Sequence, residues 1–176
     1  MTRRAALAAL SFGLALACLG VGGLAGAGQA SPPAESWRPF EGTWSASGRR
    51  QTVANETGGV AGIVEVSGAV VLTSGEGLSR GFRGEAIAFD DGQGLSIGRC
   101  VWTDERGDRL FSRLKGEAME TGKRLVGTIT GGTGRYAGLE GEYSFTWRYV
   151  VAGEDGAIQG RAVGLTGRVR RRGAPQ

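Results

Sequence analysis

From Phe40 onward, apolar and polar residues alternate in short runs separated by clusters of glycine, aspartate and asparagine. Apolar residues at every second position share one face of a β-strand, and the separating residues are those that tight turns require. No run shows a sustained 3.6-residue apolar stripe, which argues against an α/β arrangement. The pattern predicts eight strands, over residues 42–53, 60–73, 80–89, 94–103, 109–118, 123–130, 141–151 and 157–170.

The seventh run has the clearest alternation. One of its faces carries a row of apolar, mostly aromatic residues, namely Tyr143, Phe145, Trp147, Tyr149 and Val151. The other face carries Ser144, Thr146, Arg148 and Val150. Since each aromatic ring removes on the order of 150–250 Å² from water when buried, the first face is expected to form the core. If it faced outward instead, it would be an apolar patch that requires a partner.

Eight runs with short links predict an antiparallel meander, and closing such a sheet into a ring removes its exposed edges. The fold class is therefore all-β, with a single eight-stranded antiparallel barrel over residues 40–170. Glycine inside a strand favours bends, bulges or close backbone approach. Compositional bias toward alanine and glycine is the alternative explanation for the glycines inside the runs, Gly68, Gly84, Gly98, Gly116, Gly127, Gly160, Gly164 and Gly167.

The first thirty residues have the layout of a signal peptide. Arg3 and Arg4 are followed by an uncharged stretch rich in alanine, leucine and glycine, and small residues precede a cleavage position after Ala30. We expect removal of residues 1–30 and export to the periplasm or the medium, with no stable membrane span after processing; retention as an anchor is the alternative. Thr2-Arg3-Arg4 also resembles a twin-arginine signal. Leu16-Ala17-Cys18 loosely resembles a lipoprotein box, although the apolar stretch continues beyond Cys18.

Composition limits the chemistry that the chain can perform. It contains no histidine, which excludes catalytic triads and metal sites that depend on histidine. Cys100 is the one cysteine after residue 30, so no internal disulfide is expected in the processed chain. Residues 31–39 are proline-rich and predict a flexible lead-in. The carboxylates of 90–91 and 104–108 lack calcium-loop spacing and are interpreted as hairpin turns, so no metal or cofactor is expected.

The net charge of +4 does not indicate a nucleic-acid binder. Residues 31–167 contain 15 basic and 17 acidic residues, so the positive excess after residue 30 lies near the C-terminus. A folded basic face with stacking aromatics is not evident. We therefore predict no nucleic-acid partner, and we interpret residues 171–176 as a solvated basic tail that could alternatively contact an anionic surface.

One segment resembles a known family. Residues 129–141 read Ile-Thr-Gly-Gly-Thr-Gly-Arg-Tyr-Ala-Gly-Leu-Glu-Gly and lead into Tyr143. This GGTG-aromatic-x-G loop between two late strands resembles the allene oxide cyclase-like and dirigent-like barrels. The resemblance implies an eight-stranded barrel, but none of the functional residues of those proteins can be matched to a position here. From the residues themselves we expect a structural turn built by Gly131, Gly132, Gly134 and Gly138, with Tyr136 lying over the barrel end. A phosphate site is disfavoured because no Gly-Lys-Ser/Thr and no helix start follow.

Candidate site residues come from the aromatic row and its neighbours. For ligand binding we single out Arg99, Cys100, Trp102, Tyr136, Tyr143, Phe145, Trp147 and Tyr149. Cys100 is either a reactive thiol beside Arg99 or a small buried apolar side chain. Catalytic residues cannot be assigned. Charged residues inside the runs are candidates for a lumenal acid–base pair, although most are expected to point outward: Glu85, Arg99, Arg113, Glu117, Glu142, Arg148 and Arg161.

Three functions remain open from the sequence. The first is an exported barrel that binds a small, largely apolar molecule. The second is an isomerase or cyclase of the allene oxide cyclase type, and the third is a structural or interaction protein of the cell envelope with a filled barrel. A cavity would favour the first two and a carboxylate inside it the second. The resemblance also leaves room for a homo-oligomer.

Overall fold

The computed structural model describes residues 36–56, 58–116, 122 and 124–173. The expected signal peptide lies outside these residues. The elements are β1 (Arg38–Ala54), β2 (Val60–Gly75), β3 (Gly81–Asp90), β4 (Ser96–Asp104), β5 (Arg109–Gly116), β6 (Arg124–Gly132), a 3₁₀ turn η1 (Gly134–Tyr136), β7 (Leu139–Ala152) and β8 (Ala157–Arg171). All eight predicted strands are present, and the largest difference is that β1 begins at Arg38 rather than at position 42. Among the described residues, no helix is long and apolar enough to cross a bilayer.

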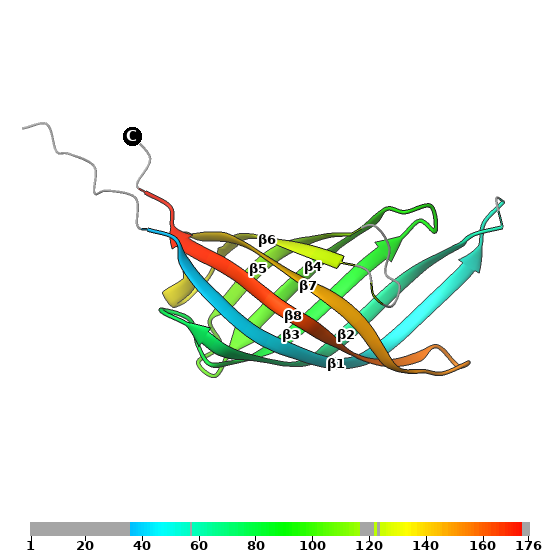
Figure 1. Cartoon of the computed structure of the whole chain (residues 1–176), viewed down its shortest axis with the longest axis horizontal. Coiled ribbons are helices and arrows are strands. Elements are labelled where there is room, and N and C mark those ends of the chain that lie inside the picture. Colours follow the sequence, from blue (N-terminus) through cyan, green and yellow to red (C-terminus); the bar gives the residue numbers. More distant parts are fainter. Residues whose placement is uncertain (1–35, 57, 117–121, 123, 174–176) are drawn as a thin grey trace, which may run out of the picture. The chain divides into compact units, whose positions relative to one another are not determined.

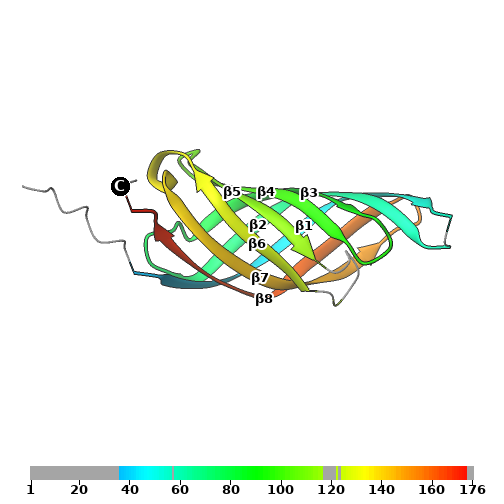
Figure 2. The ribbon, with the colours of Figure 1, turned by 90° about the horizontal axis from the view of Figure 1, so that it is seen from above.

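The strands form a closed antiparallel barrel in the order β1 to β8, which confirms the predicted fold class (Figure 1). Each strand pairs with its sequence neighbours, and β1 closes the ring against β8, for example with Trp44 opposite Ala162. Seen from above, the strands cross the barrel at a steep tilt (Figure 2). The tilt is a requirement of closure, because a sheet of eight strands can meet itself only when its register is staggered.

The alternation along β7 decides which face is the core. Tyr143, Phe145 and Trp147 are each at most 3% exposed, so the aromatic row points inward as predicted. The prediction does not extend to the end of the strand, where Val151 is 51% exposed and Tyr149 is only partly buried. The pairing with β8 shifts register between Tyr149 and Val151, and this irregularity breaks the period of two.

Glycines inside the strands make room for the aromatic rings. A Cβ on Gly127 would lie 2.1 Å from the ring of Tyr143, and one on Gly160 would lie 2.5 Å from that of Trp147. A Cβ on Gly167 would likewise lie 2.4 Å from the ring of Phe40. These rings therefore lie flat across the backbone of a neighbouring strand, which is the close approach that strand glycines permit. At these positions packing, and not only composition, accounts for the glycine.

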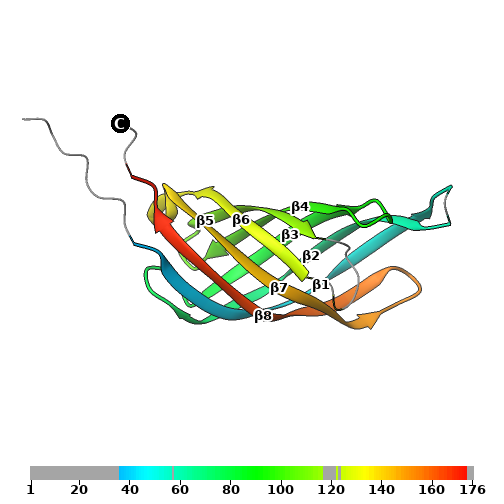
Figure 3. The same ribbon diagram turned by 45° about the horizontal axis from the view of Figure 1, so that its top comes forward.

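The two ends of the barrel differ. At one end lie the β2–β3, β4–β5 and β6–β7 connections, the start of β1 and the end of β8 (Figure 3). We call this the plug end, because η1 folds over it. At the other end, which we call the far end, lie the β1–β2, β3–β4 and β7–β8 connections. The candidate site is distributed along the lumen between them.

Basic residues near the C-terminus belong to the barrel wall. Arg168 and Arg170 lie in β8, and their guanidinium carbons stack 4.7 and 4.4 Å from the ring centre of Trp37. Arg168 also pairs with Glu142 at 2.6 Å, and Arg170 pairs with Glu140 at 2.8 Å. These contacts hold the lead-in at Trp37 against β8 and partly neutralise the basic cluster.

Candidate functional site

The lumen is lined by aromatic rings from facing strands. Trp102 on β4 lies 4.9 Å, between ring centres, from Tyr143 on β7, and Tyr143 stacks on Phe145 at 6.2 Å. Trp44 on β1 packs edge-on against Phe145 and Trp147, with ring centres 5.9 and 5.7 Å apart. These offset and edge-to-face arrangements are the favoured ones for aromatic pairs. The barrel interior is thus mostly filled by side chains.

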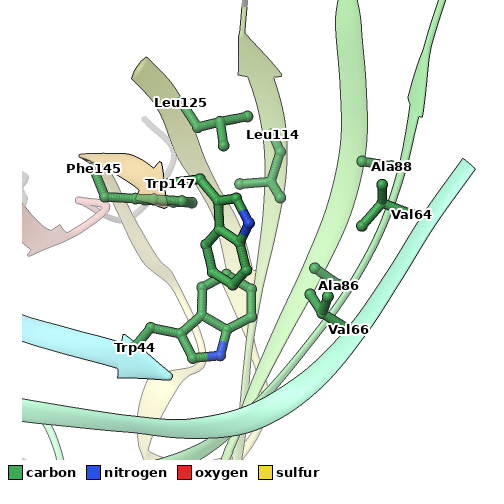
Figure 4. A pocket seen from close by; sticks show the side chains of 9 residues that line it. All are labelled: Trp44, Val64, Val66, Ala86, Ala88, Leu114, Leu125, Phe145 and Trp147. Carbon is green, nitrogen blue, oxygen red and sulfur yellow. The ribbon is translucent and has the colours of Figure 1, made fainter. Parts of the chain in front are cut away.

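A small apolar cavity remains in the half of the lumen nearer the far end. It is lined by Trp44, Val64, Val66, Ala86, Ala88, Leu114, Leu125, Phe145 and Trp147 (Figure 4). Small residues on β2 and β3 face the indole rings across it, which is why space is left there. Its volume of about 20 Å³ corresponds to room for roughly one water molecule.

Two of the rings that line this cavity carry a polar atom without a partner. The Nε1 atoms of Trp44 and Trp147 are buried and have no hydrogen-bond partner among the residues that the structure describes. In Figure 4 the nitrogen of Trp147 lies on the ring edge toward Val64 and Ala88, whereas that of Trp44 lies at the ring edge away from Trp147. The Trp44 nitrogen is close to Gly84, where an added Cβ would lie 2.9 Å from it. A buried donor without a partner costs about 1–3 kcal/mol, and buried indole N–H groups normally have an acceptor. The surface of the cavity itself is therefore apolar, and the two unsatisfied donors belong to rings that line it.

Deeper in the lumen, a buried polar pair supports the aromatic wall. The hydroxyls of Ser112 and Tyr143 lie 2.7 Å apart, and the hydroxyl of Ser112 also donates to the carbonyl of Cys100. Burial raises the pKa of the Cys100 thiol to about 11 and raises the pKa of Tyr143 well above its usual value. Both groups stay protonated at neutral pH, so Cys100 behaves as a buried small side chain and not as a nucleophile.

The plug end is closed by Tyr136 and by the carboxylate of Asp104. Tyr136 is fully buried, packs on Phe82 with ring centres 5.8 Å apart, and donates its hydroxyl to Asp104 Oδ2 at 2.8 Å. Arg135 Nε donates to the same oxygen at 2.7 Å. Burial alone would raise the pKa of Asp104, but the hydrogen bonds from Tyr136, Arg135 and two backbone amides outweigh it and lower the pKa to about 2.

The glycine loop between β6 and β7 positions Tyr136 at the plug end. Gly134 has a φ of +50°, and a Cβ there would lie 1.8 Å from a carboxylate oxygen of Asp108. Thr133 accepts a hydrogen bond from the backbone N–H of Arg109 at 2.9 Å. Gly131 and Gly138, like Gly134, have a positive φ. The loop thus acts as the predicted structural turn, and Tyr136 covers the barrel end as expected.

The far end has a polar rim. Arg50 lies directly opposite Val64 in the β1–β2 ladder and therefore shares its lumenal face. Asp90 is buried and accepts a hydrogen bond from Ser96 Oγ at 3.1 Å. Burial raises the pKa of Tyr149, while the charges of Arg50 and Asp90 act on it in opposite directions. A molecule entering the cavity from this side would pass charged and hydroxyl groups before reaching the indoles.

The structure brings together six of the eight candidate ligand residues in one interior cluster, Cys100, Trp102, Tyr136, Tyr143, Phe145 and Trp147. Tyr136 forms the plug, and Tyr149 packs against the cluster from the far end. Arg99 is exposed on the outer face. Among the charged candidates Arg113, Glu142, Arg148 and Arg161 are also exposed, Glu85 pairs with Arg83 on the outside, and Glu117 lies outside the described residues.

Sequence reasoning missed Trp44 and Asp104. Trp44 follows Phe40 at the even spacing of an inward face, a pattern that could have identified it as lumenal. Asp104 was interpreted as a turn residue, which it is, because its carbonyl accepts from Gly107 N at 3.0 Å. Its second role depends on Arg135 and Tyr136, about thirty residues later in the chain. In the described part of the chain, no group of three or more cysteines and carboxylates could hold a metal ion.

Comparison of the chain with protein-family models, with curated proteins and with solved structures found no match.

Proposed function

We propose that this protein binds a small, largely apolar molecule in the lumenal cavity, through apolar contacts and one hydrogen-bond acceptor that meets an indole N–H of Trp44 or Trp147 once the ring has turned. Apolar walls with few polar groups are typical of sites for small molecules. The walls of this cavity are aliphatic and aromatic side chains from six strands, β1, β2, β3, β5, β6 and β7. The specificity would come from the two indoles.

The unpaired indole donors carry this proposal. Both rings are nearly fully buried, at 1% and 3% exposure, so bulk water does not satisfy them. A carbonyl or ether oxygen would accept from an indole that turns its N–H toward the cavity, and each bond formed would recover about 1 kcal/mol or more. An apolar molecule without an acceptor would leave both donors unsatisfied.

The size of the cavity sets a condition on this binding. A molecule of more than a few atoms needs the walls to move, and Trp147 is the lining ring nearest the far end. Its neighbour Tyr149 is only partly buried and lies 6.2 Å away between ring centres. We expect the Trp147 ring to shift toward the far end when a ligand enters.

A structural or interaction protein with a filled barrel is the second candidate, and the small cavity favours it. In that case the cavity would stay empty, because no polar atom at its surface could hold a water molecule. An isomerase of the allene oxide cyclase type is less well supported, because none of the described cavity-lining residues is a carboxylate.

Membership of the allene oxide cyclase-like or dirigent-like barrels remains a proposal, supported by the barrel topology and by the loop between β6 and β7. Export after cleavage near Ala30 is likewise proposed from the sequence.

The test compares cyclopentanone with cyclopentane, which have similar shape but differ in the acceptor. The chain has four tryptophans, so four indole N–H resonances are expected in a nitrogen–proton correlation spectrum. Cyclopentanone should move the resonances of Trp44 and Trp147 downfield and leave those of Trp37 and Trp102 in place. Cyclopentane should produce no downfield shift.

Trp102 provides a matched control. Its Nε1 is also buried and unpartnered among the described residues, but it does not line the cavity. Trp147→Phe should weaken cyclopentanone binding and Trp102→Phe should not. Native mass spectrometry of protein purified from its own host would then identify a natural ligand. Indole resonances that stay unchanged at saturating cyclopentanone would refute the binding proposal and leave the filled barrel.

A further inference from the structure

The outer face of β3 and its neighbours carries an exposed apolar patch. Ile63 on β2, Phe89 on β3 and Ile97 on β4 lie directly opposite one another in one ladder row, and each is between 45% and 48% exposed. Ile87, two residues before Phe89 on β3, is 53% exposed. We call these four residues the β3 patch.

The β3 patch is large for a surface that contacts only water. Four half-exposed large side chains present on the order of 400 Å² of apolar area, which is within the range of the largest patch on a typical monomer. Such patches commonly mark an interaction site. The remaining question is which partner fits this one.

Charges beside the patch identify the partner. Glu65 on β2 and Arg99 on β4 are the two residues directly opposite Ile87, one on each side. Neither forms an ion pair with another described residue; the guanidinium of Arg99 contacts only the carbonyl of Gly98. Opposite charges therefore stand on the two sides of β3, without an ion-pair partner among the described residues. One strand further out, where the barrel surface curves away, the same row carries Arg49 on β1 and Arg113 on β5.

This arrangement is self-complementary under one symmetry operation. A two-fold axis parallel to β3, through Ile87 and Phe89, exchanges the positions over β2 and β4. A second copy placed this way sets its Glu65 over Arg99 and its Ile63 over Ile97, twice each. An axis across the strands would instead place the charged row over the apolar row. Closed two-fold dimers use one surface on both copies, and this surface meets that requirement.

We propose that two copies of this chain associate through the β3 patch as a two-fold dimer, with Glu65 of each copy paired with Arg99 of the other. Glu85 is the next outward residue of β3 toward the plug end. Its ion pair with Arg83 on the same strand keeps that border of the interface neutral.

The dimer is expected to be weak and concentration-dependent. The outside of a small barrel is convex, so the contact is restricted to three strands and falls below the roughly 800 Å² per partner of a standard interface. We expect a dissociation constant in the range of about 10–100 μM, which sedimentation equilibrium can measure directly.

Charge reversal tests both the face and its symmetry, using protein in the form that accumulates in its host. Glu65→Arg and Arg99→Glu should each weaken association by about tenfold or more, because each creates two like-charge contacts. The double variant restores both pairs and should return the wild-type dissociation constant. These residues are on the outer face, and circular dichroism would verify that each variant is folded.

Apolar substitutions supply the second arm. Ile87→Ser should weaken the dimer, whereas Val163→Ser on β8, also exposed and apolar at 40%, should not. A wild-type protein that stays monomeric up to about 1 mM would overturn the proposal. So would a dimer unaffected by Ile87→Ser, or a double charge variant that fails to associate.

Discussion

Replacing Gly127 with alanine should test the packing of aromatic rings over strand glycines. The added Cβ would lie 2.1 Å from Tyr143 Cζ, whereas ordinary contact begins at 3.4 Å, so the ring would have to retreat by 1.3 Å. The ring has little freedom to do so. Trp102 lies 4.9 Å and Phe145 6.2 Å from it between ring centres, and its hydroxyl is held at 2.7 Å by Ser112.

The expected cost follows from three contributions. Overpacking of a tight core costs about 1–3 kcal/mol, and losing the Ser112–Tyr143 hydrogen bond costs about 1 kcal/mol. Restricting the unfolded chain by removing a glycine returns about 0.4–1 kcal/mol. Gly127→Ala should therefore destabilise the barrel by about 1–4 kcal/mol, and the middle of that range lowers Tm by on the order of 10 °C in a domain of this size.

Urea unfolding followed by circular dichroism would measure this loss, with two comparison variants. Gly81→Ala is the matched control, since a Cβ there meets nothing within 4 Å, and it should be neutral or slightly stabilising. In a Tyr143→Leu background the clash is absent, so Gly127→Ala should cost much less. Equal stability of Gly127→Ala and wild type, or an equal loss in both backgrounds, would contradict the reasoning.

Three further outcomes are expected at the plug and in the core. The folded-state pKa of Asp104, about 2, is below its ordinary value of 3.8. Its carboxylate therefore stabilises the fold above pH 4, and this stability is lost as the pH falls toward 2. Urea titrations should show a smaller loss of stability between pH 4 and pH 2 in Asp104→Asn than in the wild type. Cys100 should not react with Ellman's reagent at pH 8 in a folded Cys18→Ser chain and should react once the chain is unfolded in urea; fast labelling of the native protein would be inconsistent with its burial. Gly134→Ala should destabilise the protein by more than Gly138→Ala, although both have positive φ, because only Gly134 would also clash with a side chain; the second is expected to cost about 1–2 kcal/mol in thermal unfolding.

Local sequence patterns predicted the strands and turns because those depend on neighbouring residues. The period of two in Tyr143, Phe145 and Trp147 was sufficient to place them in the core, and the glycine loop was sufficient to predict a structural turn. The alternation of apolar and polar residues over positions 95–101 was less informative, because Arg99 shares a face with Leu95 and Ile97. That face is the outer one, since Cys100 and Trp102 point inward.

The cavity could not be predicted, because it depends on register across the barrel. The partnership of Trp44 with Trp147 requires β1, β7 and β8 to be joined at the closure, and nothing local to either residue specifies that. The same is true of Asp104, whose buried carboxylate is balanced by residues from a different loop. Long-range pairing decides which polar atoms are satisfied and which, like the two cavity indoles, are not.

The position of the first and last barrel residues determines how this barrel can be attached to anything else. Arg38 pairs with Val169, so the start of β1 and the end of β8 lie together beside the plug. A fluorescent protein or a sensor surface joined directly before Arg38 or directly after Arg171 would therefore leave the rim with Arg50 and Tyr149 uncovered. Binding measurements on immobilised protein should consequently give the same result for both attachment points.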